Sequence, residues 1–425
     1  MRIGYYAHHH GSGHCRQADK LAALLPSAWL QSLTVFTSLD TDAYTFKTIT
    51  EAQIVRLSPE DERLDDVLPG RAGQYWQPEC LHYSPVGNPD IQTRSWQLLD
   101  GMRQRNIDLM IIDVSVEVAM FCRAVSMPYL YVRLAGNRDD APHLNAFAGA
   151  LGLLVPYPQV LESAMTPNWI RQKSLYLDFL TSANAPNVTY DGFIDILTKL
   201  PSHTNACKSI KTLAQHSDDI KKDKCRPLIV TVIKGYGGHE AIDAKLSELR
   251  HVMPNAFIIS LGPIDDDKRN YVDIATHVSD VTTFIAHSDL LLMACGLNSI
   301  AQVYPYATPL IVLPDDRPHQ EQELMADALI TQGRALSWQQ FMNQTSNTSE
   351  REIHQNILSS LSNTSKDIDT NPYKQNKDQY HCQNSGQSNA AAHTFMTSLT
   401  QYSSIKLWFQ QWLLPQLDLI PERIK

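Results

Sequence analysis

The chain has 425 residues, 43% of them hydrophobic, and a formal net charge of −9 at pH 7. This length exceeds one ordinary hydrophobic core and predicts two domains of roughly 150 to 200 residues each. The acidic balance argues against a nucleic-acid partner, and seven cysteines without a CxxC pair favour free thiols over a disulfide framework or a zinc site. No run approaches the roughly 18 apolar residues of a membrane span, and Met1–Tyr5 has no signal-peptide core, so we expect a cytoplasmic protein.

The N-terminal residues predict a strand, a glycine-rich turn and a helix. The apolar run Ile3–Ala7 comes first, residues 8–13 form the turn, and apolar residues at helical spacing cover Cys15–Leu25. A dinucleotide-binding turn is one alternative, but Gly11-Ser12-Gly13 lacks the third glycine of that fingerprint.

His14 stands at the predicted start of this helix. A neutral imidazole at that position can take a proton near neutral pH, so we predict a general base. Two alternatives remain open. His14 caps the helix, or it joins His8 and His10 in a metal site, although adjacent ring ligands without a nearby carboxylate pair are unusual for zinc.

A buried strand is predicted at Asp108–Asp113, and its last residue is an acid. The carboxyl ends of parallel strands meet at one edge of a sheet, so Asp113 is expected beside His14, where it can hold the other ring N–H. Capping of the next helix is an equally open role for Asp113. Glu117, Asp139 and His143 are the next candidates for the base.

The irregular stretch Ser58–Gln92 is rich in aromatic residues, and we expect it to form a wall of an acceptor pocket, with plain packing or cover as the alternative. A further strand at Met127–Leu134 leads into a polar run. On the acceptor side we predict a set of residues near these strand ends, namely Ser12, Gly13, Glu117, Arg133, Arg138, Asp139 and His143.

A second α/β domain is predicted to follow a crossover segment. Its first strand, Pro227–Lys234, ends in the glycine-rich turn Gly235–Glu240. The backbone amides of Gly237 and Gly238 in this turn can meet a diphosphate, although three glycines also suit an ordinary turn.

The stretch Asp289–Gly333 organises this second domain. A buried strand at Asp289–Ala294 breaks at Gly296, and a short amphipathic helix follows at Asn298–Tyr304. Free backbone N–H groups and the Ser299 hydroxyl then lie at the positive end of a helix, where a phosphate is favoured. A second strand at Thr308–Pro314 leads to the same edge of the sheet, and two ordinary strand–helix units without a ligand are the alternative.

Two motifs in this stretch resemble the donor-binding half of GT-B-fold UDP-sugar-type glycosyltransferases, such as glycosyltransferase family 28 and the UDP-glycosyltransferases. They are Cys295-Gly296-Leu297-Asn298-Ser299 and the pair Glu321-Gln322, with Ala326 four residues on. Gly11-Ser12-Gly13-His14 is similar to the end of the first strand in the inverting members. Gln302 stands where many relatives have a ribose-binding glutamate, so any bond to a ribose hydroxyl comes from a neutral partner.

The resemblance implies an α/β protein of two facing Rossmann-like doubly wound domains, with a C-terminal helix that returns to the first domain. It implies inverting, metal-independent transfer of a sugar from a nucleoside diphosphate, with UDP expected, to a hydroxyl acceptor, and no cofactor. His14 and Asp113 would be catalytic, and Glu321 and Gln322 would bond sugar hydroxyls. The implied donor and diphosphate residues are Gly237, Gly238, Gly296, Asn298, Ser299, Gln302, Glu321 and Gln322.

Two other functions remain open at this point. A nucleotide-sugar 2-epimerase uses a similar two-domain fold and would need carboxylates, rather than one histidine, near the sugar. A catalytically silent nucleotide-sugar-binding protein is the alternative from another class.

The predicted domains are 1–165, a crossover and linker at 166–225, and the nucleotide-sugar domain 226–344. Residues 345–400 are polar and are expected to be largely disordered, because they have few apolar anchors. In the last predicted element, 401–425, Ile405–Leu417 recovers helical periodicity. This helix is expected to pack across the first domain, and peripheral contact with a membrane surface is the alternative.

Overall fold

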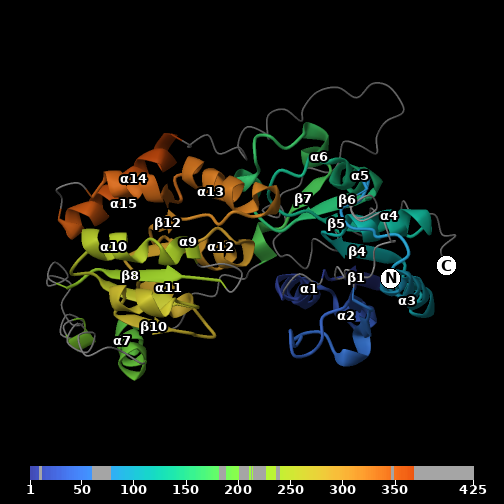
Figure 1. The fold of residues 1–425 in the computed structure, drawn as a ribbon, viewed down its shortest axis with the longest axis horizontal. Helices are drawn as coiled ribbons and strands as arrows, with labels where there is room; N and C mark the ends of the chain where they lie inside the picture. The colour runs from blue at the N-terminus through green and yellow to red at the C-terminus, as the bar shows by residue number, and fades with distance from the viewer. Residues whose placement is uncertain are drawn as a thin grey trace. The chain divides into compact units, whose positions relative to one another are not determined.

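The computed structural model describes residues 1–8, 12–59, 78–180, 188–200, 210–211, 213, 226–235, 240–345 and 349–367. These residues fall into two compact units. Unit 1 holds Met1–Gln159 and Ala164–Leu180, and unit 2 holds Val160–Ser163 and the described residues between Thr181 and Gly386. Each unit is a β-sheet flanked by helices (Figure 1). In the part of the chain that is described, no helix is both long and apolar enough to cross a membrane.

The described sheet of unit 1 is parallel throughout, in the order β3-β2-β1-β4-β5-β6-β7. Its strands are β1 (Ile3–Tyr6), β2 (Thr34–Thr37), β3 (Ile54–Arg56), β4 (Leu109–Asp113), β5 (Tyr129–Val132), β6 (Gly152–Val155) and β7 (Ser174–Tyr176). Its helices are α1 (Gly13–Leu24), α2 (Ser27–Ser32), α3 (Pro89–Gln104), α4 (Val116–Ala124), α5 (Ala141–Gly149) and α6 (Asn168–Gln172). The strand order reverses between β1 and β4, which makes this pair the switch point of the sheet.

Both faces of this sheet are buried, because successive strand residues point to opposite sides. Tyr5 packs in a cluster with Ala18 and Leu21 of α1. The next residue, Tyr6, packs on the other side with Leu98 of α3 and with residues of α4 and α5. Helices therefore cover both faces, which is the doubly wound arrangement that the sequence predicted.

The described sheet of unit 2 is also parallel, in the order β10-β9-β8-β11-β12-β13. Its strands are β8 (Ile229–Ile233), β9 (Phe257–Leu261), β10 (Ile274–Thr276), β11 (Leu290–Met293), β12 (Leu310–Val312) and β13 (Leu336–Ser337). Its helices are α7 (Tyr190–Lys199), α9 (Glu240–Asp243), α10 (Leu246–Val252), α11 (Thr282–His287), α12 (Leu297–Val303), α13 (Glu321–Thr331), α14 (Trp338–Asn343) and α15 (Glu350–Asp367). Here the order reverses between β8 and β11.

Gly262 is a position in unit 2 where only glycine fits. It follows β9 with a φ of +108°, and an added Cβ would lie 2.5 Å from the Lys234 carbonyl oxygen. Lys234 is also joined to the residue before Gly262, by a hydrogen bond of 2.9 Å from Lys234 N to Leu261 O. The close approach of these two strand ends therefore depends on the missing side chain.

The predicted crossover and linker at 166–225 is wrong where the structure describes it. β7 (Ser174–Tyr176) pairs with β6 and completes the sheet of unit 1. α7 belongs to unit 2, because Phe193 makes an edge-to-face contact with Phe284 of α11 in the same apolar cluster. A strand of three residues carries too little periodicity to be recognised from sequence, so the first domain was ended too early.

The predicted disorder of 345–400 is wrong for α15. Ile353 and Ile357 are fully buried against the core of unit 2. Arg351 Nη2 donates to Arg226 O at 2.8 Å, and the His354 ring donates to Asp289 O at 3.0 Å. The polar average of the segment hid an apolar residue on every helical turn. Residues 368–400, and the predicted terminal helix within 401–425, lie outside the described residues.

We expect Ile357→Ala to lower the free energy of unfolding by about 2 to 5 kcal/mol, because it opens a cavity in a closed core. Leu358→Ala on the same helix is the matched control, since Leu358 is 43% exposed. It should change stability by less than about 0.5 kcal/mol. Urea unfolding of both variants measures the difference. Equal, near-zero effects would mean that α15 does not dock on unit 2.

Candidate active site

The site in unit 1 is built at the switch point between β1 and β4. α1 follows β1 and carries His14 in its first turn, and Asp113 is the last residue of β4. His14 Nδ1 lies 3.0 Å from Asp113 Oδ2, with side-chain exposures of 17% and 0%. A hydrogen bond from Nδ1–H to the carboxylate places the basic lone pair of the neutral ring at Nε2. The structure thus brings together the two residues predicted to be catalytic.

The capping alternatives for these two residues are wrong. The N-cap of α1 is Ser12, one residue before the helix begins at Gly13. The N-cap of α4 is Ser115, whose hydroxyl accepts a hydrogen bond from Val118 N at 3.2 Å. Neither His14 nor Asp113 therefore caps a helix, and the two side chains bond to each other instead.

Tyr5 is the site residue that sequence reasoning missed. Its hydroxyl donates to Asp113 Oδ2 at 3.0 Å, and the residue is 2% exposed. Burial, followed by the charge of Asp113, raises the pKa of Tyr5 well above its ordinary value, so the phenol stays a neutral donor. The only sequence signal was its place in the first predicted strand, which also suits a plain core residue.

The turn after Asp113 is strained and held in place. Val114 has a φ of 55°, a left-handed conformation that a β-branched residue rarely adopts. The Tyr131 hydroxyl donates to Val114 O, and Ser115 N donates to Asp113 O at 2.9 Å. These bonds offset a strain of about 1 to 3 kcal/mol and fix the direction of the Asp113 side chain.

Glu117 holds a loop rather than presenting a base. Its Oε1 accepts from the backbone N–H groups of His82 and Tyr83 at 2.8 and 2.9 Å. Its Oε2 accepts from the Ser115 hydroxyl at 3.2 Å. With both oxygens engaged, Glu117 positions the loop that carries His82, and its candidacy as the catalytic base is not supported by this geometry.

His143 also belongs to a hydrogen-bond network. Its ring Nε2 lies 3.0 Å from Arg138 Nη1, and arginine can only donate, so Nε2 accepts and Nδ1 carries the hydrogen. Nδ1 therefore donates to Asp140 Oδ2 at 2.7 Å, while Asp140 Oδ1 meets His82 Nε2 at 3.0 Å. His143 is 1% exposed, and burial, with the nearby Arg138 charge, lowers the pKa of His143 to about 3. A buried ring with both nitrogens engaged is poorly placed to act as the base.

This network also bears on metal binding. A metal ligated by His143 Nδ1 would have to replace the hydrogen that Arg138 fixes there. The geometry of His82, Asp140 and His143 therefore favours hydrogen bonding over ligation of a cation. The alternative of a metal site formed by His8, His10 and His14 stays a prediction, because His10 lies outside the described residues.

The remaining acceptor-side residues are placed as follows. Ser12 and Gly13 start α1. Arg133 is buried, with its guanidinium 6.0 Å from the centroid of the Tyr157 ring. Asp139 is exposed. All of them follow β1 or β5 at the carboxyl-terminal edge of the sheet.

The switch point of unit 2 lies between β8 and β11, where the predicted phosphate turn stands. Gly296 precedes α12, and Asn298 and Ser299 are in its first turn. Ser299 N already donates to Gly296 O at 2.9 Å, so Ser299 can offer a ligand its hydroxyl but not its amide. Gln302 is exposed, and its Nε2 donates to Asn298 O at 3.0 Å. Gly237 and Gly238 lie outside the described residues.

Gln322 differs from its predicted role. Its Oε1 accepts from Cys295 N at 3.1 Å and from Asp315 N at 3.0 Å, so it ties together the ends of β11 and β12. A sugar hydroxyl can therefore be met only by its Nε2, which faces Gly296. Glu321 opens α13 after His319 and Gln320, whose φ values of 61° and 54° are left-handed. No local pattern in the sequence reveals the two bonds from backbone N–H groups to Gln322 Oε1.

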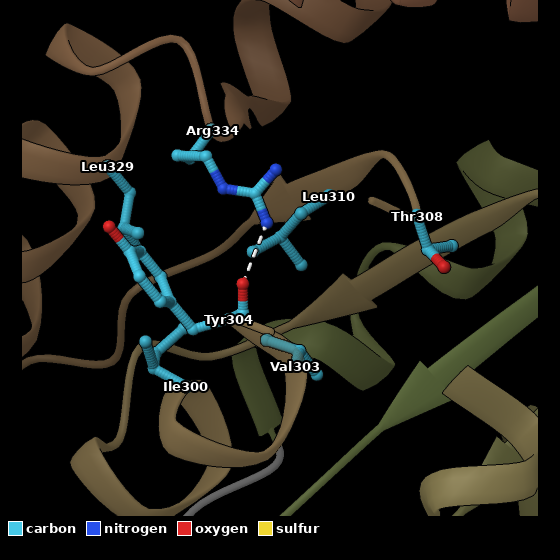
Figure 2. A pocket seen from close by; sticks show the side chains of 7 residues that line it. All are labelled: Ile300, Val303, Tyr304, Thr308, Leu310, Leu329 and Arg334. Atoms are coloured by element: carbon cyan, nitrogen blue, oxygen red, sulfur yellow. Dashed lines mark hydrogen bonds between the residues drawn. The ribbon is translucent and has the colours of Figure 1, made fainter. Parts of the chain in front are cut away.

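A small cavity behind α12 is a packing feature and not a donor pocket. It encloses about 10 Å³, enough for one water at most, and is lined by Ile300, Val303, Tyr304, Thr308, Leu310, Leu329 and Arg334 (Figure 2). The Arg334 guanidinium donates to the Tyr304 and Tyr306 carbonyl oxygens at 3.0 and 2.6 Å. It thereby satisfies carbonyls at the end of α12, where a cation is favoured.

Solved structures share this fold, although no family model and no curated protein sequence matches the chain. A UGT transferase from Siraitia grosvenorii in complex with UDP is 12% identical, with a TM-score of 0.50 over 86% of this chain and 94% of that chain. Spinosyn forosaminyltransferase SpnP is 13% identical, with a TM-score of 0.51 over 87% and 95%. Medicago truncatula UGT71G1 complexed with UDP-glucose is 12% identical, with a TM-score of 0.51 over 86% and 93%. The predicted GT-B fold is thus confirmed.

Acid should destabilise the protein in part through His143. Its pKa of about 3 in the folded state lies below the ordinary value of 6.5, so the unfolded chain takes up a proton first as the pH falls. The stability from this residue is present above about pH 6.5 and is lost below it at about 1.4 kcal/mol per pH unit.

His143→Gln should therefore flatten the fall of unfolding free energy between about pH 6.5 and 4. Urea unfolding at a series of pH values measures the slope, with the exposed residue His251 changed to Gln as the matched control. An unchanged slope in His143→Gln would contradict the buried neutral ring.

Proposed function

We propose that the chain is an inverting, metal-independent glycosyltransferase, which moves a sugar from a nucleoside diphosphate, with UDP expected, to a hydroxyl acceptor. The observation that carries the proposal is the contact of 3.0 Å between His14 Nδ1 and Asp113 Oδ2 at the switch point of unit 1. The shared fold with solved glycosyltransferases supports it, since two of those structures hold UDP or UDP-glucose.

In the proposed reaction, His14 Nε2 takes the proton of the acceptor hydroxyl as its oxygen bonds to the anomeric carbon. The bond from that carbon to the phosphate oxygen breaks, and the nucleoside diphosphate leaves with the electron pair. Asp113 keeps the ring oriented and stabilises the imidazolium that forms. The single displacement inverts the configuration of the anomeric carbon.

Donor binding is assigned to unit 2. The charge on the departing diphosphate would be met by the Ser299 hydroxyl, by Asn298 in the first turn of α12, and by the amides of Gly237 and Gly238. Fixed dipoles of this kind can do what a metal ion does in other transferases. Glu321 would accept from sugar hydroxyls, and Gln322 would donate through Nε2.

The epimerase alternative is less well supported. It would need carboxylates next to the sugar, but Asp113 Oδ2 already meets His14 and Tyr5. Both oxygens of Glu117 are also engaged. A base formed by a histidine and a carboxylate fits transfer to a hydroxyl better.

His14→Ala should lower kcat by roughly 10² to 10⁴-fold, because it removes the general base. The dissociation constant of the nucleotide sugar should change by less than about twofold, since donor binding is assigned to unit 2. Asp113→Asn should also lower kcat, because the ring loses its orientation and its counter-charge. Acceptor-dependent release of nucleoside diphosphate, over a panel of nucleotide sugars and hydroxyl acceptors, measures the rates.

The exposed residue His251 provides the control variant, His251→Ala, and thermal unfolding shows that each variant is folded. Full activity of His14→Ala would overturn the assignment of the base. All assays are repeated in EDTA. Activity that disappears in EDTA and returns with manganese would contradict metal independence, while leaving the role of His14 to its own test.

A further inference from the structure

The Tyr5 hydroxyl lies in an otherwise apolar setting. Tyr5 lies on the interior strand β1, and its ring packs with Ala18, Leu21 and Val132 in an apolar cluster. A phenylalanine would fill this space equally well, and a buried hydroxyl costs free energy unless it is hydrogen-bonded. Its partner is Asp113 Oδ2, at 3.0 Å.

The two oxygens of Asp113 are used very unequally. Oδ2 accepts from both Tyr5 Oη and His14 Nδ1, each at 3.0 Å. Oδ1 is buried, and no donor among the described residues reaches it. A carboxylate with 0% exposure depends strongly on its hydrogen-bond donors. If the Tyr5 donor is lost, Oδ2 carries more negative charge toward the remaining donor, His14.

We propose that Tyr5 is a positioning residue of the His14–Asp113 pair, whose hydroxyl holds the carboxylate toward the ring and draws electron density from the shared oxygen. This rests on the proposed function, in which His14 is the base. Without the hydroxyl, the carboxylate is a stronger acceptor and binds the imidazolium more tightly. His14 then holds its proton to higher pH, and the base is lost to protonation earlier as the pH falls.

Other charged and titratable groups surround the three residues on every described element packed against them. His8 after β1, Cys15 on α1 and Tyr131 on β5 interact with the three residues directly. Asp19 on α1 and Arg56 on β3 act on Cys15, and Glu117 on α4 and Arg138 after β5 act on Tyr131. All of them stay in place when only the Tyr5 hydroxyl is removed. A comparison of wild type with Tyr5→Phe therefore isolates that one hydrogen bond.

The test follows the His14 ring by NMR in protein labelled at the histidine Cε1 carbon, titrated without substrate. The His14 signal is identified by its absence in His14→Gln. In Tyr5→Phe we expect the titration midpoint of His14 to move to higher pH by about half a unit. The acidic limb of the kcat/KM profile should move by the same amount.

Tyr129→Phe is the matched control. Tyr129 is also fully buried in this sheet, and its hydroxyl donates to Ala146 O at 2.7 Å, away from Asp113. Both variants lose one buried hydrogen bond, so both should lower Tm by a few degrees, but only Tyr5→Phe should move the His14 midpoint. A midpoint that stays, falls, or moves equally in Tyr129→Phe would overturn the proposal. Since the ring titration needs no turnover, a failure here is separate from a failure of His14→Ala to lose activity.

Discussion

The arrangement of unit 1 depends on one buried charge, the carboxylate of Asp113. A carboxylate with no exposed surface is costly unless donors compensate it, and both donors to this one come from β1 and the helix that follows it. Tyr5 reaches it from β1, and His14 reaches it from the first turn of α1. Val114, the next residue along the chain, has a left-handed φ of 55°. The requirement to satisfy this charge and the requirement to orient a base are met by the same contacts.

In unit 2, a neutral side chain, Gln322, holds the strand ends at the switch point together. Gln322 places one amide oxygen between the backbone N–H groups that follow β11 and β12. This keeps the Gly296 turn and the start of α13 in a fixed relation without adding a charge. The absence of an added negative charge suits a place proposed to receive a diphosphate, where a carboxylate would repel the ligand. A glutamate at 322 would impose that repulsion.

The fold could be predicted from the sequence because short stretches of residues determine most of its strands and turns. Continuous apolar runs gave β4, β8 and β11, and the glycine turns marked where strands pass into helices. Asp113 and His14 were predictable as neighbours because parallel strands deliver their ends to one edge. β7 was missed because three residues carry little periodicity, and α15 because a polar average hid the spacing of Ile353 and Ile357.

Side-chain roles were harder to predict wherever they rest on long-range bonds. Tyr5 gave no local sign of its hydroxyl contact with a residue more than a hundred positions away. Gln322 was expected to meet a sugar, but its Oε1 accepts from two backbone N–H groups, which leaves only its Nε2 for that role. Glu117 and His143 were candidates by residue type alone, and the structure engages both in loop-holding networks. The residue types in a sequence show which side chains could act chemically. Only the structure shows which of their atoms are not already used in hydrogen bonds within the protein.

The central claim is a single displacement in which the His14–Asp113 pair activates the attacking oxygen. Its most direct measurement uses water as the acceptor and an α-linked nucleoside diphosphate sugar as the donor, with proton NMR of the sugar as it is released. Inversion predicts that the β-anomer appears first and then equilibrates with the α-anomer. Initial release of the α-anomer would contradict the account, because a single back-side displacement by the oxygen that His14 activates cannot retain the configuration of the anomeric carbon.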